Sequence, residues 1–234
     1  MPCKNSRKSY DSNGYYHVYN RGVEKRLIFQ DKQDYAVFRS YLRTYLTEKD
    51  EISLNLSLSR LGLNPRERDR ILKEIQLNNF YGEITLIAYC LMPNHFHFLI
   101  HQNSAESMDK FMNSLCTRYT MFFNKKYDRV GPLYQGVYKA VSVLSEEQLL
   151  YLTNYIHRNP YNPSLRLQGL ALEAWTRWTS QPSSYPEYLG LRQTEWVRPE
   201  IILNFFSKTN PRLSYQAFVE QDEDISIIQK IILD

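Results

Sequence analysis

The sequence is poor in cysteine and has no long apolar run. Its 234 residues contain three scattered cysteines, without the spacing of a disulfide framework or of a Cys-x-x-Cys pair. No stretch reaches the about 18 consecutive apolar residues of a membrane-spanning helix, and the N-terminus does not show the pattern of a signal peptide. With 43% hydrophobic residues the chain can bury a core, which argues against disorder. We therefore expect a cytoplasmic protein with reduced thiols and no membrane partner.

Negative charge is concentrated at the C-terminal end. The formal net charge is +4, but residues 218–234 contain five acidic residues and one basic residue, which leaves +8 on the remainder. A basic cluster lies within residues 108–139: Lys110, Arg118, Lys125, Lys126, Arg129 and Lys139. With 19 tyrosines, a cationic surface is compatible with nucleic acid, because basic side chains bind phosphate and aromatic rings stack on bases. A solvated basic face explains the same pattern equally well.

Hydrophobic periodicity predicts an α+β chain. Strands are expected at residues 15–20, 84–91 and 95–101 and late in 131–143, and helices at 31–47, 66–77, 109–124 and 145–159. Asp31 and Ser145 are the expected N-caps of the first and last helices. This order predicts a ferredoxin-like or RRM-like antiparallel sheet with helices packed on one face. We expect a main domain at 14–165 with a helical insertion at about 48–80, and a C-terminal extension with an acidic tail at 166–234.

Two histidines begin the second strand of the predicted hairpin. Alternate residues of a strand share a face, so His95 and His97 point the same way, about 6.5–7 Å apart at Cα, while Phe96 points to the opposite layer. Such a pair can hold one metal ion. Taken alone, His-x-His is more often a pair of histidines on the solvated side of a sheet.

The last predicted helix carries a tyrosine at the border of its apolar stripe. Leu149, Leu152 and Ile156 form the stripe, and Tyr155 lies about 90° from its centre at 100° per residue. Asn159 follows one turn later, where it can offer a carbonyl oxygen to whatever the histidines hold. The alternatives are a rim aromatic at Tyr155 and a helix-ending amide at Asn159.

The motifs together resemble one family. In chain order they are Tyr16-His17-Val18, Asn20-Arg21-Gly22, Met92-Pro93-Asn94-His95-Phe96-His97, Gly131-Pro132-Leu133-Tyr134-Gln135-Gly136, Tyr155-Ile156 with Asn159-Pro160, and Trp178 with Ser183-Ser184-Tyr185. This set resembles the REP-associated tyrosine transposases, a bacterial branch of the single-tyrosine HUH nucleases in the IS200-like transposase superfamily. The resemblance covers most of residues 14–190.

The resemblance implies a chemistry and a site. His95 and His97 match the family's metal-binding histidines, Asn159 matches the third ligand, and Tyr155 matches the nucleophile. It implies a Mg²⁺- or Mn²⁺-dependent single-stranded DNA endonuclease and strand transferase that forms a 5′-phosphotyrosine on hairpin or palindromic repeat DNA. It also implies a nucleoid-associated protein in the bacterial cytoplasm, and a monomer, with the dimer of related enzymes as the alternative state.

Several alternatives stay open at this point. Arg21, Arg118, Lys125, Lys126, Arg129 and Lys139 are candidate DNA contacts. Tyr119 is a second candidate nucleophile, but no amide follows it in the same register. A domesticated hairpin-DNA-binding protein that does not cleave, and a zinc-stabilised structural or RNA-processing domain, are the competing functions.

Overall fold

The strands form one antiparallel sheet in the order β2-β3-β1-β4. The computed structural model describes residues 10–160, 181–220, 225–229 and 232. Its strands are β1 (Gly14–Arg21), β2 (Ile84–Met92), β3 (His95–Gln102) and β4 (Lys139–Val143). Its helices are α1 (Lys32–Leu46), α2 (Glu51–Leu58), α3 (Pro65–Gln76), α4 (Ser107–Lys126), α5 (Glu146–Arg158), α8 (Tyr185–Tyr188), α9 (Glu200–Leu203) and α10 (Tyr215–Glu220).

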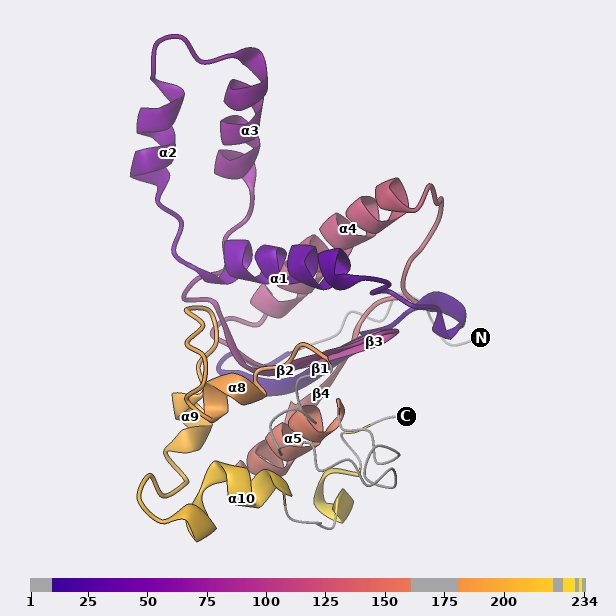
Figure 1. Cartoon of the computed structure of the whole chain (residues 1–234), viewed down its shortest axis with the longest axis vertical. Coiled ribbons are helices and arrows are strands. Elements are labelled where there is room, and N and C mark those ends of the chain that lie inside the picture. The colour runs from indigo at the N-terminus through magenta and orange to yellow at the C-terminus, as the bar shows by residue number, and fades with distance from the viewer. Residues whose placement is uncertain (1–9, 161–180, 221–224, 230–231, 233–234) are drawn as a thin grey trace.

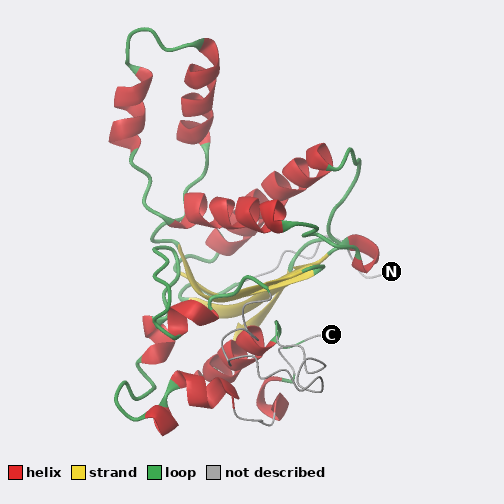
Figure 2. Ribbon diagram, viewed as in Figure 1, coloured by secondary structure: helices red, strands yellow, loops and turns green. Residues whose placement is uncertain are grey.

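The fold class predicted from the sequence is confirmed. The chain runs β1-α1-β2-β3-α4-β4, and α1 and α4 lie together on one face of the sheet (Figure 1). The opposite face is not bare, because α5 and the C-terminal helices cover it (Figure 2). The helices thus form two layers around the sheet rather than the single layer expected. Among the described residues, no helix is long and apolar enough to cross a bilayer.

Strand alternation divides the core into two clusters. Phe96, Phe98 and Ile100 of β3 point toward α1 and α4, into a cluster rich in aromatic rings. His97 and Leu99 point the other way, and Leu99 joins a second cluster that contains Leu152 and Ile156 of α5. One face of β3 is therefore aromatic and apolar and the other carries the histidines, because successive side chains of a strand point to opposite faces.

A β-bulge interrupts the pairing of β2 with β3. The register shifts between Leu86 and Ala88, so that Ile87 is one extra residue on the β2 side. Ile87 and Ala88 both belong to the cluster under α5, whereas Leu86 and Tyr89 belong to the aromatic cluster. The bulge explains why β2 has a continuous apolar sequence instead of a clean alternation.

Both predicted N-caps are present. The Asp31 carboxylate accepts the backbone N–H of Asp34 at 3.0 Å, and the Asp34 side chain in turn accepts the Asp31 N–H. The Ser145 hydroxyl accepts the backbone N–H of Gln148 at 3.1 Å. Each cap satisfies helix N–H groups that would otherwise have no partner, and so defines where its helix begins.

Residues 48–80 contain two helices that pack against each other. The sequence predicted α3 but not α2, and the pair projects away from the sheet (Figure 1). At its base, Lys49 Nζ donates to the carbonyls of Ile75 and Leu77, and Asn79 Nδ2 donates to those of Thr44 and Thr47. These bonds join the two ends of the segment. Trp178 and parts of the acidic tail lie outside the described residues.

Candidate active site

Pairing of β1 with β3 assembles one polar patch on the sheet. Tyr19 pairs with His97, and Arg21 pairs with His95. Residues at paired positions point to the same side, so the β1 side chains lie beside the two histidines. The ring of Tyr19 stacks on that of His97, with centroids 5.7 Å apart. The rings of His95 and His97 are perpendicular, with centroids 4.9 Å apart.

Helix α5 brings the tyrosine to this patch. Leu152 and Ile156 are fully buried against the sheet, which fixes the rotation of the helix. Tyr155 is half-buried, and its ring lies edge-on to His97 with centroids 5.4 Å apart. The Asn159 side-chain N–H donates to the Tyr155 carbonyl at 3.2 Å, and Asn159 lines the same cavity as His95. The four residues predicted to form the site are therefore neighbours.

These side chains line one cavity of about 460 Å³. Its other walls come from the end of β1 and from the segment before β4. The lining residues are Tyr19, Asn20, Arg21, His95, His97, Gln135, Gly136, Val137, Lys139, Tyr155 and Asn159. A cavity of this size, with convergent polar groups, is typical of a small-ligand or active site.

Hydrogen bonds orient both histidines in the same way. His97 Nδ1 lies 2.9 Å from His17 Nε2, and His95 Nδ1 lies 2.6 Å from the Asn94 side-chain oxygen. If each Nδ1 carries the proton, each Nε2 keeps its lone pair for a ligand. A second hydrogen bond of this kind is the usual way in which a protein fixes the tautomer of a metal-binding histidine.

Burial keeps these histidines neutral. Desolvation, followed by the charge of Arg21, lowers the pKa of His95 to about 4. Desolvation, followed by the charges of His17 and His95, lowers the pKa of His97 well below its usual value. Neutral imidazole is the form that binds metal, so both rings are competent ligands at neutral pH.

The donor set fits a divalent ion only if the amide takes part. In the part of the chain that the structure describes, no cluster of three or more His, Cys, Asp or Glu side chains could hold a metal. The Asn159 amide donates its N–H to the Tyr155 carbonyl, which leaves its oxygen available to a ligand in the cavity that Asn159 and His95 both line. Two imidazole nitrogens and one amide oxygen form a mixed set that suits Mn²⁺ or Mg²⁺ with open positions.

Two of the predicted DNA contacts lie in the cavity. Arg21 and Lys139 both line it, and Lys139 Nζ lies 5.7 Å from the centre of the Tyr19 ring. Their charges are positioned to attract an anionic ligand to the cavity.

The other four predicted contacts lie on or just after α4, across the sheet from Tyr155. Lys126 is held by Asp31 at 2.6 Å and by the fully buried Asp34 at 2.7 Å. Arg118 stacks over the ring of Tyr41 at 3.9 Å. These two cations have intramolecular partners, and the role of all four residues as DNA contacts stays a prediction. Arg129 donates to the Asn124 side-chain oxygen at 2.9 Å, and Lys125 is exposed.

The alternative nucleophile is excluded by its surroundings. Tyr119 is fully buried, and its hydroxyl donates to the Ile28 carbonyl at 2.6 Å. Burial, followed by the charge of Asp34, raises the pKa of this phenol. No substrate could reach it without unfolding of the aromatic core.

No role was predicted from the sequence for Tyr19 or Asn94, whereas the hydrogen-bonded structural role expected for His17 on the adjacent strand is confirmed. His17, Tyr19 and Arg21 have the spacing of one strand face, which was the available signal for Tyr19. The Tyr19 hydroxyl is buried without a hydrogen-bond partner among the described residues, and desolvation followed by the charge of Tyr155 raises its pKa. Asn94 could not be assigned because its role depends on the turn geometry.

Two histidines, an amide and a tyrosine around one cavity define the class of site, a candidate metal-assisted tyrosine centre. Comparison with known proteins then gives one family match over part of the chain. Residues 65–159 match the family model described as "Transposase IS200 like". The match confirms the resemblance drawn from the motifs, over the segment that contains His95, His97, Tyr155 and Asn159. No curated protein matches the chain.

Two solved structures are similar to the chain. One is a REP-associated tyrosine transposase bound to a REP hairpin, with 11% identity and a TM-score of 0.45, covering 90% of this chain and 96% of that one. The other is a candidate transposase from Deinococcus radiodurans, with 16% identity and a TM-score of 0.27, covering 65% of this chain and 95% of that one.

Proposed function

We propose that this protein is a metal-dependent single-stranded DNA endonuclease and strand transferase that forms a 5′-phosphotyrosine at Tyr155. The observation that carries the proposal is the meeting of Tyr155 with His95, His97 and Asn159 around one cavity. The family match supports the class of activity, because it spans all four residues. The cleavage of DNA, its dependence on a metal ion and the 5′-phosphotyrosine intermediate are parts of this proposal.

His95 Nε2, His97 Nε2 and the Asn159 amide oxygen are the groups that would hold a divalent ion, Mn²⁺ or Mg²⁺. When bound, such an ion supplies Lewis-acid stabilisation of the charge on the non-bridging phosphate oxygens. The chain's own contribution is to orient the two rings through His17 and Asn94 and to keep them unprotonated by burial.

Tyr155 supplies the nucleophile. Its phenol oxygen forms a bond to phosphorus as the bond from phosphorus to the 3′ oxygen breaks, and the phenol proton is lost to water or a base. The products are a 5′-phosphotyrosine and a free 3′ hydroxyl. Because one phosphodiester replaces another, a second 3′ hydroxyl can reverse the step without ATP. Arg21 and Lys139 line the cavity and provide charge for the strand's phosphates.

Single-stranded DNA, or the unpaired strand beside a hairpin, is the proposed substrate. Base pairing in a duplex would hold the backbone away from a narrow cavity whose nucleophile is half-buried. We extend the proposal to palindromic repeat DNA in the bacterial nucleoid, acted on by a monomer.

A trapping experiment tests the proposal. A labelled DNA hairpin with single-stranded flanks is incubated with the protein and Mn²⁺, and the products are separated on a denaturing SDS gel. The expected result is a covalent adduct with the unmodified protein and none with Tyr155→Phe. Tyr151→Phe is the matched control, because Tyr151 lies one turn earlier on α5 and outside the cavity, so its adduct should persist.

Three outcomes would contradict the proposal. An undiminished adduct with Tyr155→Phe would assign the chemistry to another residue. Hairpin binding by the unmodified protein, with no adduct in Mn²⁺ or Mg²⁺, would favour the second candidate, a hairpin-binding protein that has lost cleavage. Retention of zinc on purification, without DNA binding, would favour a zinc-stabilised structural domain.

A further inference from the structure

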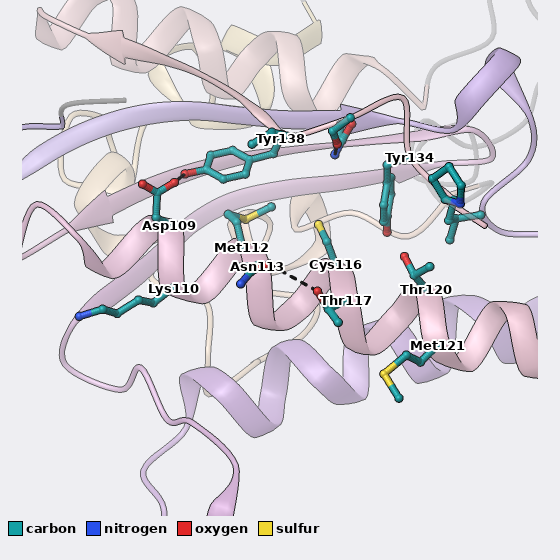
Figure 3. A pocket seen from close by; sticks show the side chains of 15 residues that line it. Asp109, Lys110, Met112, Asn113, Cys116, Thr117, Thr120, Met121, Tyr134 and Tyr138 are labelled. Carbon is teal, nitrogen blue, oxygen red and sulfur yellow. Dashed lines mark hydrogen bonds between the residues drawn. The ribbon is translucent and has the colours of Figure 1, made fainter. Parts of the chain in front are cut away.

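A second and larger cavity, of about 820 Å³, lies beneath α4. It is an open hollow between this helix and the segment before β4, and its walls are mainly apolar (Figure 3). Met112, Leu133 and Tyr138 are buried in these walls. At its mouth, Val137 and Met121 are 71% and 68% exposed. The volume lies within the about 300–1,000 Å³ typical of sites for organic ligands.

A buried hydroxyl without a partner lies within the wall of this cavity. Tyr134 is 7% exposed, and its phenol oxygen has no hydrogen-bond partner among the described residues. Figure 3 shows the ring extending toward α4, with its oxygen on the side of Thr120. A buried polar group left unpaired is unfavourable, so a small shift of the ring that brought this oxygen to a ligand's hydrogen-bonding edge would be favoured.

The large cavity adjoins the candidate active site. Asn20, Gly136 and Val137 line both cavities. The Asn20 side-chain N–H donates to the Gly136 carbonyl at 3.1 Å, which holds the dividing segment against β1. The apolar cavity therefore lies on the other side of this segment from the candidate active site.

From this geometry we infer that the large cavity binds an unpaired nucleobase of the same DNA strand. The inference rests on the proposed function and adds a recognition subsite to it. A nucleobase combines an apolar face with a hydrogen-bonding edge, and this cavity combines buried apolar and aromatic walls with the amide of the exposed Asn113. Contact of bases with such walls gives affinity that charge alone does not provide.

The test compares two DNA strands of equal charge. Oligothymidylate of about 20 nucleotides and an abasic strand of the same length are titrated against the Tyr155→Phe protein, with binding followed by fluorescence anisotropy. One stacked base is expected to make oligothymidylate bind about tenfold more tightly, or more. Thr117→Trp is then introduced into the Tyr155→Phe protein, where it fills the cavity from an exposed position on α4. It should reduce the ratio of the two affinities, oligothymidylate over abasic strand, toward one.

Matched variants separate cavity filling from general effects. Ala36→Trp places the same ring at an exposed position on α1 outside the cavity and should keep the full ratio. Asn113→Trp, at another exposed lining position, repeats the test if Thr117→Trp lowers the melting temperature. In a second measurement, 5-iodouracil at successive positions of the strand should cross-link to Tyr134 or Tyr138.

The outcomes distinguish this inference from the proposed function. A Tyr155 adduct combined with an unchanged ratio in both tryptophan variants would overturn the nucleobase subsite alone. Cross-links confined to residues outside the cavity would do the same. Absence of any DNA binding would overturn both. A ratio that falls only in the cavity variants supports the inference.

Discussion

At the scale of single residues, the hydrogen bond between His17 and His97 determines which nitrogen atom of His97 faces the candidate active site. His17 lies on β1, and its Nε2 is 2.9 Å from His97 Nδ1. The two rings are also stacked, with centroids 5.1 Å apart. His17 thus fixes both the tautomer and the plane of His97, although it does not line the candidate active site.

Replacement of His17 tests this control. His17→Phe keeps a ring in the stack but removes the hydrogen bond, so the affinity for Mn²⁺ should fall by about 10–100-fold. Isothermal titration calorimetry with Mn²⁺ measures the change. His101→Phe is the control, because His101 shares the β3 face but packs on Tyr15 instead, with ring centroids 4.7 Å apart. Equal Mn²⁺ affinity in both variants would show that His17 has no part in orienting His97.

At the scale of elements, the C-terminal half of α5 is fastened to the segment that follows it. His157 is fully buried, with Nδ1 2.6 Å from the Tyr215 hydroxyl and Nε2 2.7 Å from the Ser184 hydroxyl. The Ser184 hydroxyl also accepts the backbone N–H of Tyr89 at 2.8 Å. Because His157 comes two residues after Tyr155, this chain of bonds from β2 through α5 to α10 fixes the rotation of the helix that carries the nucleophile.

This arrangement makes stability depend on pH. Desolvation lowers the pKa of His157 to about 3, below the ordinary 6.5, so the unfolded chain binds the proton more readily than the folded one. The free energy of unfolding should therefore fall as the pH drops from about 6.5 toward 3, by up to about 1.4 kcal/mol per pH unit for this group. Urea unfolding at several pH values measures the slope.

The contribution of His157 can be separated from those of the other histidines. His157→Gln should be less stable than the unmodified protein at neutral pH, because it disturbs buried hydrogen bonds. Its stability should also depend less steeply on pH across the same window. An unchanged slope in the variant would mean that the titration of His157 is not linked to folding.

Strong local signals made most elements predictable. Alternation and the turn at Asn94 identified β2 and β3, and caps at Asp31 and Ser145 identified the starts of α1 and α5. Helix α2 was missed because its sequence has no buried stripe, and none of its residues is buried. Elements are recognised when local propensity and tertiary packing agree.

The candidate site was only partly predictable for the same reason. The spacing of His95 and His97 puts them on one face, but their meeting with Tyr155 required family motifs, since the packing of α5 is a long-range property. The partner of Lys126 was not foreseeable, because Asp34 lies 92 residues away in sequence. Charge clusters in a sequence therefore say little about which cations remain available for DNA.

At the scale of the whole molecule, the α2–α3 pair is an appendage to the sheet. It projects from the body (Figure 1), and the bonds of Asn79 to Thr44 and Thr47 already join the points where it leaves and returns. The body should therefore fold without it.

Replacement of residues 49–77 by a short Gly/Ser linker tests this independence. The melting temperature should change by only a few degrees, because each doubling of loop length alters the closure free energy by about 0.6 kcal/mol. Formation of the Tyr155 adduct should also persist. Scanning calorimetry and the denaturing gel provide the two measurements. Loss of cooperative unfolding would show that the pair belongs to the folding core.

The extra residue in β2 constrains how this hairpin can be re-engineered. An unbroken strand would alternate through Leu86 and Ala88 on one side, yet the protein sends Leu86 and Tyr89 there. The bulge therefore exchanges the two faces to which alternate residues of β2 point, from Ala88 onward. A β2 segment transplanted from a regular hairpin must be one residue shorter to match. If its length were conserved instead, Cys90 would turn into the aromatic layer and Tyr89 would lie under α5.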